Sequence, residues 1–167
     1  SYVLPQKFPG GTGGLPYVTI IIPTYNEEKV IAERVKNLEA LKYPADKLQV
    51  IIIDSGSNDR TFQIALESSG RSHLDCLALR QEERKGKANA VNHAIKYAKG
   101  DIILVSDANA LFEKDSIQQI VRPFADKKIG GAGGRFVTLG TNLVGKGEEL
   151  YWSIEGKIRK AESTPTI

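Results

Sequence analysis

The sequence predicts an α/β fold in which helices cover both faces of a mostly parallel β-sheet. Three short apolar runs rich in β-branched residues, at 18–22, 50–53 and 102–105, indicate strands that are buried on both faces. Helical patterns with one apolar side separate these runs, so strand and helix alternate along the chain. Such alternation is typical of a doubly wound sheet with right-handed crossovers.

Length and composition favour a single domain with an ordinary core. The chain has 167 residues, of which 41% are apolar and 26% are charged. The net charge is +3 and the basic residues are spread along the chain, so no nucleic-acid partner is expected. The single cysteine, Cys76, excludes an intramolecular disulfide and a multi-cysteine zinc site. No apolar run approaches the ~18 residues that a membrane span requires.

Residues 1–16 are expected to form an irregular N-terminal arm, because prolines and paired glycines recur within them. The domain would then occupy 17–167. The first helix is expected to begin near Glu27, where negative charge suits a helix N-terminus. Further helices are predicted at 61–68 and 88–98, and in the former Phe62, Ala65 and Leu66 are expected to face inward.

The remaining elements have softer boundaries. A weaker strand is predicted at 76–79, between the second and third apolar runs. A helix is expected over 115–124, and a strand at 137–139 after a glycine-rich stretch. The last predicted element is a helix from about Glu148, where apolar residues recur one turn apart.

Polar clusters follow the apolar runs at 23–27, 54–59 and 106–109. Turn and N-cap chemistry would explain any one of them alone. In parallel sheets, however, the carboxyl ends of the strands meet at one edge, where ligands bind. Asp54 and Asp107 each end an apolar strand, and carboxylates there can accept base or ribose hydrogen bonds or hold a divalent cation. Together the clusters predict a ligand site.

Basic residues at 84–87 stand at the start of a predicted helix, where the helix dipole disfavours positive charge. A phosphate bound by Lys87 and the free N–H groups of that helix start would relieve this, and a solvated basic loop is the equal alternative. The stretch 140–146 begins like a phosphate-binding loop, but Gly147 stands where a hydroxyl should hold magnesium, so we discount it.

Four ordered segments resemble the boxes of the family 2 glycosyltransferases, a family that includes bacterial polysaccharide synthases. They are 22–27 (Ile-Pro-Thr-Tyr-Asn-Glu), 54–59 (Asp-Ser-Gly-Ser-Asn-Asp), 84–92 and, at the place of the Asp-x-Asp motif, 106–109. The resemblance implies the three-layer, Rossmann-like GT-A fold of nucleotide-diphospho-sugar transferases. It also implies that this chain is the truncated, donor-binding N-terminal part.

The resemblance implies a role for each matching residue. Thr24 and Tyr25 would line the base pocket, and Asp54 would accept a hydrogen bond from a uracil ring. Lys87 would approach the ribose or phosphate, and Asp107 would face the ribose and a metal. The complete set of implied donor-nucleotide residues is Pro23, Thr24, Tyr25, Glu27, Asp54, Ser57, Lys87 and Asp107.

Two departures from the family pattern bear on chemistry. Asn109 replaces the second aspartate of the metal motif, so Mn²⁺ or Mg²⁺ held by Asp107 and Asn109 would bind more weakly. The family's acceptor half, with its general base, is expected beyond Ile167, which leaves the catalytic base unidentified and the fragment itself inactive.

The expected function is inverting transfer of a hexosyl group from a UDP-sugar to a saccharide or lipid-linked acceptor. The resemblance implies a membrane-associated parent protein, anchored by segments outside this chain at the cytoplasmic face of the cell membrane. The alternative is a non-catalytic module that binds nucleotide sugars for regulation. A nucleotidyltransferase ranks last, because the glycines at 10–14 lack an accompanying arginine and lysine.

Overall fold

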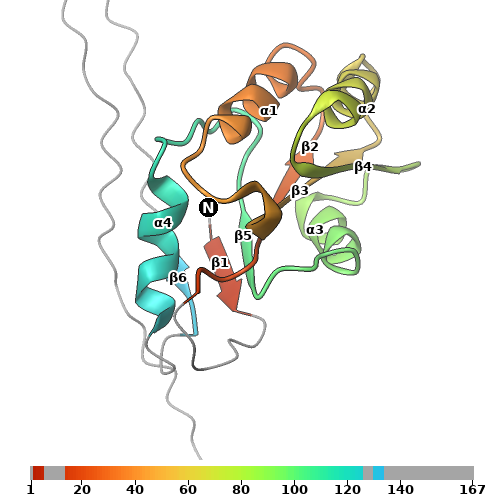
Figure 1. Ribbon diagram of the computed structural model, residues 1–167. Coiled ribbons are helices and arrows are strands. Elements are labelled where there is room, and N and C mark those ends of the chain that lie inside the picture. The colour runs from red at the N-terminus through yellow and green to blue at the C-terminus, as the bar shows by residue number, and fades with distance from the viewer. Residues whose placement is uncertain (1, 6–13, 126–129, 134–167) are drawn as a thin grey trace, which may run out of the picture.

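The chain folds around a six-stranded sheet with helices on both faces (Figure 1). The computed structural model describes residues 2–5, 14–125 and 130–133. The strands are β1 (Tyr2–Pro5), β2 (Val18–Thr24), β3 (Leu48–Ser55), β4 (Asp75–Gln81), β5 (Ile102–Val105) and β6 (Ala132–Gly133). The helices are α1 (Ile31–Glu39), α2 (Thr61–Arg71), α3 (Lys87–Ile95) and α4 (Ser116–Val121), with 3-10 turns η1 (Ala45–Lys47) and η2 (Arg122–Ala125).

The strand order is β4-β3-β2-β5-β1-β6. The first four strands in this order run parallel, whereas β1 pairs antiparallel with both β5 and β6. From β2 the chain moves outward through β3 to β4, and then returns to place β5 on the other side of β2. The sheet therefore has a topological switch point between β2 and β5, where ligands bind in folds of this kind. The predicted α/β class with a mostly parallel sheet is confirmed.

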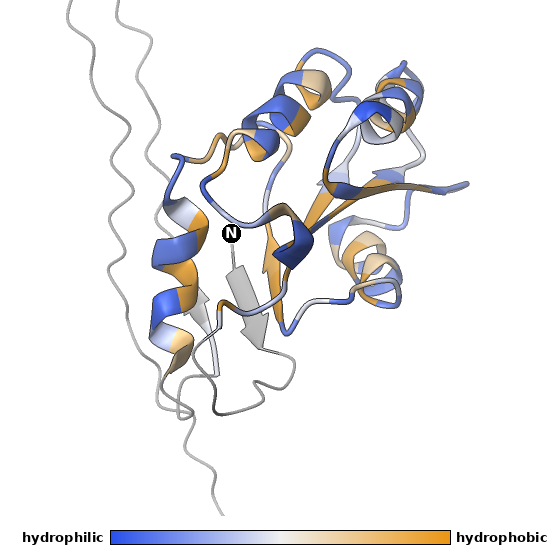
Figure 2. Cartoon of the chain, in the orientation of Figure 1, coloured by the Kyte–Doolittle hydropathy of each residue, from blue (hydrophilic) through white to orange (hydrophobic). Residues whose placement is uncertain are grey.

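Alternate residues of the central strands enter two separate cores. Ile20 and Ile22 pack with residues of α1, α2 and α4, whereas Ile21 and Ile51 pack with α3 on the opposite face. This two-sided burial explains why the strands are apolar without interruption. Figure 2 shows the result, with hydrophobic strands in the centre and hydrophilic residues on the outer sides of the helices. The three-layer arrangement is as predicted.

The N-terminal arm differs from the expectation of irregular backbone throughout 1–16. Tyr2–Pro5 forms β1, which pairs with β5 from Ile102 to Val105. Proline patterns report on local backbone preference, whereas this strand is held by a partner about 100 residues away in sequence. Pro5 stands at the end of the strand, where the missing N–H costs little.

Two helix details also differ from prediction. The first helix begins at Ile31 instead of near Glu27, because 28–30 form a turn. In α2 the buried residues are Thr61 and Ala65, and Leu66 is 53% exposed instead of facing inward. Residues four apart share a helix face, and the next residue is turned by about 100° from it.

The predicted strand at 137–139 and the predicted helix from Glu148 lie outside the described residues. Among the residues that are described, no helix has the length and apolar character needed to cross a membrane.

Candidate functional site

A cavity of about 280 Å³ lies beside the carboxyl end of β2, close to the switch point of the sheet. Its volume is near the lower end of the ~300–1,000 Å³ range of small-molecule sites. It is lined by Pro23, Thr24, Tyr25, Glu27, Ser55, Arg84, Gly86 and Lys87. The structure thus brings together residues from three of the four segments that resemble family boxes, at the edge where the sequence predicted a ligand site.

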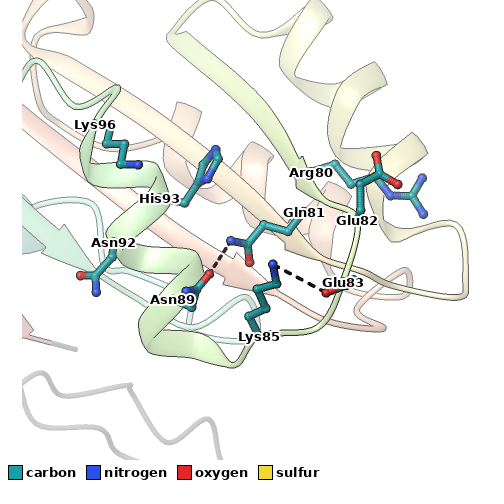
Figure 3. Close-up of a pocket in the computed structure, with 9 residues that line it drawn as sticks. All are labelled: Arg80, Gln81, Glu82, Glu83, Lys85, Asn89, Asn92, His93 and Lys96. Atoms are coloured by element: carbon teal, nitrogen blue, oxygen red, sulfur yellow. Dashed lines mark hydrogen bonds and ion pairs between the residues drawn. The ribbon is translucent and has the colours of Figure 1, made fainter.

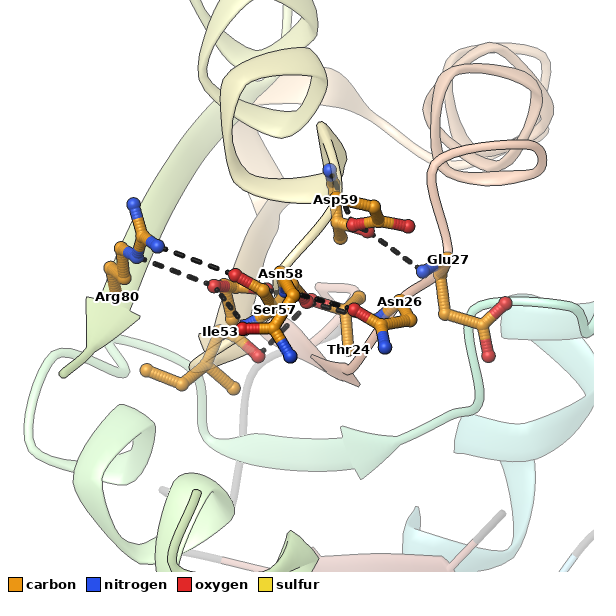
Figure 4. Close-up of polar contacts among 10 residues, drawn as sticks. Thr24, Asn26, Glu27, Ile53, Ser57, Asn58, Asp59 and Arg80 are labelled. Atoms are coloured by element: carbon orange, nitrogen blue, oxygen red, sulfur yellow. Dashed lines mark hydrogen bonds and ion pairs between the residues drawn. The ribbon is translucent and has the colours of Figure 1, made fainter. Parts of the chain in front are cut away.

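The loops after β2 and β3 are tied together by hydrogen bonds between backbone and side chains (Figure 4). The backbone N–H of Asn26 donates to Ser57 Oγ at 2.8 Å, and the Asn26 Oδ1 accepts from the Asn58 N–H at 3.0 Å. The Glu27 N–H donates to Thr61 Oγ1 at 2.7 Å. Asn26 adopts a left-handed backbone conformation, with φ of 55°, that asparagine tolerates better than most residues. These contacts hold one wall of the cavity in place.

Asp59 also links the loops after β2 and β3. Its carboxylate accepts from the backbone N–H and the hydroxyl of Thr61 and from the Glu28 N–H. Burial raises the pKa of Asp59, but these hydrogen bonds stabilise the carboxylate more, so the pKa lies below its usual 3.8. Asp59 is therefore a structural anion of the loop.

Asp54 does not line the cavity, although the sequence predicted that it would accept from a nucleobase. Its side chain is 0% exposed, and its carboxylate accepts from the backbone N–H of Ser57 at 3.2 Å and from the Ser57 hydroxyl. The guanidinium of Arg80 lies 3.6 Å away on the other side. In this geometry Asp54 and Ser57 build the turn after β3, and their predicted contact with nucleotide stays a prediction.

Ser55 is the residue of this turn that lines the cavity. It is 5% exposed, and its hydroxyl oxygen is buried without a hydrogen-bond partner in the described structure. Buried hydroxyl groups are normally hydrogen-bonded, so Ser55 has hydrogen-bonding capacity that the described structure does not use. Sequence reasoning missed Ser55 because it gave Asp54 the role. Strand alternation predicts that Asp54 and Ser55 point to opposite sides, but it does not say which side carries a cavity.

Arg84 and Gly86 are the other lining residues that were not predicted as nucleotide ligands. The guanidinium of Arg84 stacks on the ring of Tyr25, with its Cζ 4.0 Å from the ring centroid. Gly86 precedes α3 with φ of 83°, a conformation that side chains strongly disfavour. The backbone thus turns sharply there and brings Lys87 and the N-terminus of α3 to the cavity.

Lys87 and Asp107 meet at the switch point. The Lys87 ammonium forms an ion pair with the Asp107 carboxylate, and both side chains are about half exposed. Buried and exposed residues alternate in the loop after β5. Ala108 and Ala110 are 3% and 0% exposed, whereas Asp107 and Asn109 are exposed. The predicted metal ligands are therefore both accessible. Among the described residues, no group of three or more His, Cys, Asp or Glu side chains could hold a metal ion.

A larger groove of about 610 Å³ lies between the end of β4 and the outer side of α3 (Figure 3). Two pairs of its side chains contact each other: the amide of Gln81 donates to Asn89 at 2.8 Å, and Lys85 lies 3.6 Å from Glu83. The Gln81 Oε1 is buried without a hydrogen-bond partner in the described structure. The charges of the groove are of both signs, and most of its side chains are exposed. We therefore consider the smaller cavity, at the switch point, the candidate site.

Known glycosyltransferases match this chain in sequence. The family model of glycosyl transferase family 2 matches residues 19–165. A beta-monoglucosyldiacylglycerol synthase from Nostoc sp. is 33% identical over 142 residues, which are 84% of this chain and 29% of that protein. A poly-beta-1,6-N-acetyl-D-glucosamine synthase from Staphylococcus aureus is 29% identical over 165 residues, or 97% of this chain and 39% of that protein.

Solved structures show the same fold. A mannosyltransferase from Pyrobaculum calidifontis, in complex with GDP-Man and Mn²⁺, aligns with a TM-score of 0.66 and 37% identity over 68% of this chain and 34% of its own. TarS 1–349 of S. aureus, in complex with UDP-GlcNAc, aligns with a TM-score of 0.59 and 29% identity over 66% of this chain and 31% of its own.

The chain spans about 29–39% of the length of these curated relatives, so it corresponds to a fragment of them. The match nevertheless covers the described elements from the second residue of β2 onward, including the three loops that surround the candidate site. The chain belongs to glycosyl transferase family 2.

Proposed function

We propose that this chain binds the nucleotide part of a sugar donor for inverting hexosyl transfer, and that the donor is a UDP-sugar. The observation that carries the proposal is the cavity at the switch point. Its wall joins the loop after β2 to Lys87 and to the N-terminus of α3. Such a site offers a base surface and an anion-binding end side by side, as a nucleoside diphosphate requires.

Each wall of the cavity would serve one part of the nucleotide. The Tyr25 ring and the unpaired hydroxyl of Ser55 would contact the base or ribose. The first turn of α3 contains no acidic residue, so its free N–H groups and the Lys87 ammonium would face the diphosphate. To bind phosphate, Lys87 would leave Asp107, which would then be available to the ribose and a cation.

The exposed oxygens of Asp107 and Asn109 fit a Mg²⁺ or Mn²⁺ ion that takes its remaining ligands from phosphate and water. Magnesium typically binds proteins through one or two carboxylates plus substrate phosphates, so two side-chain oxygens on one accessible loop suffice. Such an ion would neutralise charge on the departing diphosphate. The complex of a family relative with GDP-Man and Mn²⁺ supports the proposal.

The acceptor and cellular place are proposed for the whole protein. The names of the matched synthases suggest a saccharide or lipid-linked acceptor. We further propose that the complete protein acts at the cytoplasmic face of the cell membrane, through segments outside this chain. This placement rests on the family resemblance and is tested by fractionation of the full-length protein.

Calorimetric titration of the 167-residue chain with UDP, GDP and ADP, each with and without Mn²⁺, tests donor binding. We expect UDP to bind more tightly than GDP and ADP, and Mn²⁺ to increase its affinity. Preferential binding of GDP would refute the uridine proposal and would make this chain resemble the mannosyltransferase that is solved with GDP-Man. No binding of any nucleotide would refute the donor-site proposal for this chain.

A pair of lysine variants locates the site. Lys87→Met should weaken UDP binding about tenfold, because it removes a charge-assisted hydrogen bond to phosphate. Lys85→Met removes the same charge two residues away, from a side chain that lines the groove between β4 and α3. Equal effects of the two variants would mean that the chain attracts UDP only through its overall charge.

A further inference from the structure

Arg34 is the one charged side chain among the largest fully buried residues of the described chain. It lies on α1 and is 0% exposed. None of the ion pairs among the described residues includes it. Desolvation lowers the pKa of its guanidinium to about 9 and the nearby Asp107 carboxylate opposes this shift, so the group is still charged at neutral pH.

The guanidinium contacts both ends of the loop after β5. One terminal nitrogen, Nη2, donates to the hydroxyl of Ser106 at 2.9 Å, directly before Asp107. The plane of the group lies over the ring of Phe112, with Cζ 4.1 Å from the ring centroid. Arg34 therefore touches the first and the last residue of the segment 106–112, which carries the exposed side chains of Asp107 and Asn109.

A second residue of α1, Asn37, also contacts the end of this loop. The other terminal nitrogen of Arg34 donates to the Asn37 Oδ1 at 2.7 Å. That oxygen also accepts from the backbone N–H of Phe112 at 2.9 Å, and the Asn37 amide donates to the Phe112 carbonyl at 2.9 Å. The end of the loop is thus held on both backbone groups by a side chain that Arg34 orients.

Stability alone gives little reason for a buried arginine here. Taking a guanidinium out of water is unfavourable, and replacement of buried charges by apolar side chains of similar volume often leaves stability unchanged or raises it. The Nε of Arg34 has no hydrogen-bond partner in the described structure, so its hydrogen bonds do not fully replace those that the guanidinium makes with water. Its contacts instead converge on the loop that holds the proposed metal ligands.

We propose that Arg34 is a positioning residue, which fixes the backbone of 106–112 so that Asp107 and Asn109 face the donor diphosphate and its cation together. The role rests on the proposed donor site and deepens it. Residues that orient metal ligands from behind commonly matter for affinity by ~10–100-fold.

The test compares Arg34→Met with Lys36→Met. Both remove one positive charge from α1, but Lys36 is exposed and has no place in the loop contacts. Urea unfolding of each variant, and amide hydrogen exchange of residues 106–112 without ligand, are measured first. We expect Arg34→Met to unfold at no lower urea concentration than Lys36→Met, and to exchange faster at Ala110 and Phe112. Unchanged exchange in the loop would overturn the proposal.

The second measurement is UDP affinity with and without Mn²⁺. Arg34→Met should reduce the gain in affinity that Mn²⁺ provides about tenfold and leave the affinity without metal nearly unchanged. An equal loss under both conditions, accompanied by lower stability, would assign Arg34 a purely structural role and overturn the proposal. Lys36→Met should match the wild type in both conditions.

Two further outcomes separate this proposal from the donor-site proposal. If the wild-type chain binds no nucleotide, the proposed function fails, whereas the exchange measurement still decides whether Arg34 fixes the loop. If Arg34→Met does not fold, Arg34→Lys serves instead. Lysine keeps the charge but lacks the planar fork that contacts Ser106 and Asn37, so it should show the same faster exchange.

Discussion

The two ends of the parallel strands use buried polar side chains in opposite ways. At the amino end, Thr19 and Gln49 are 0% and 1% exposed and have partners: Thr19 donates to Gln49 at 2.8 Å and accepts from the Gly100 N–H at 2.9 Å. The side-chain Oε1 of Gln49 also accepts from the backbone N–H of Lys99 at 2.9 Å. At the carboxyl end, the Ser55 hydroxyl is buried beside a cavity and has no partner in the part of the chain that the structure describes.

The difference teaches how to separate structural from functional polar residues in this fold. A buried polar group whose hydrogen-bonding atoms all have protein partners contributes to stability, whereas one left unpaired beside a cavity has hydrogen-bonding capacity that the fold does not use. Asp54 shows that a position at the carboxyl end of the sheet does not by itself identify a functional residue. It lies at the carboxyl end, yet Ser57 and Arg80 already use its oxygens.

The largest effect is expected at the amino end, from Gly100→Ala. A Cβ there would lie 2.5 Å from the Thr19 backbone nitrogen and 2.8 Å from the Ile102 carbonyl oxygen, and backbone atoms cannot move aside. We expect a loss of about 2–3 kcal/mol in the free energy of unfolding, measured by urea denaturation. Gly70→Ala is the control, because nothing lies within 4 Å of its Cβ. It should stabilise α2 by about 0.5–1 kcal/mol. Equal stability of the two variants would contradict the close approach at Gly100.

Asp54→Ala should behave like a change at the amino end. It removes the acceptor of the Ser57 bonds and leaves Arg80 without its carboxylate, so the free energy of unfolding should fall by about 2 kcal/mol. UDP affinity of the protein that remains folded should change less than in Ser55→Ala. Lost affinity at unchanged stability would instead make Asp54 a direct nucleotide ligand, as the sequence first predicted.

Ser55→Ala should have the reverse profile. The hydroxyl has no partner among the described residues, so the free energy of unfolding should change by less than about 0.5 kcal/mol, whereas UDP affinity should fall by about 1 kcal/mol, or roughly fivefold. Ser116→Ala is a matched control, since its buried hydroxyl is also unpaired but lies on α4, outside the cavity wall. If both variants bind UDP like the wild type, the unpaired hydroxyl of Ser55 has no role in binding.

The smallest effect concerns Asp59 and is seen in its pH dependence. Because the folded-state pKa lies below the usual 3.8, the ionised carboxylate stabilises the fold at neutral pH. This contribution is present above the unfolded-state pKa and is lost as the pH falls through the lower folded-state pKa. Asp59→Asn should therefore be less stable than the wild type at pH 7, by under about 1 kcal/mol, and the difference should vanish once the pH has fallen below the folded-state pKa. A difference that persists in acid would exclude the carboxylate charge as its cause.

Local pattern was a reliable guide to the central sheet. The apolar run at 102–105 coincides with β5, and the runs at 18–22 and 50–53 lie within β2 and β3. A strand buried on both faces must be apolar at every position, so its residues identify it without knowledge of its neighbours. Leu66 shows the limit of such patterns. An apolar residue at the border of a helix's buried face is either covered or exposed according to how the helix packs, and Leu66 of α2 is 53% exposed.

The sequence by itself determined the fold class, the family and the edge of the sheet at which ligands bind. These follow from strand patterning and from box residues that parallel topology must bring together. Only the tertiary structure decided that Ser55 lines the cavity instead of Asp54, that Tyr2–Pro5 joins the sheet beside β5, and that Arg34 lies beneath the loop of Asp107. Each of these depends on contacts between residues distant in sequence, and hydrogen-bond partners of that kind leave no periodic signal in the chain.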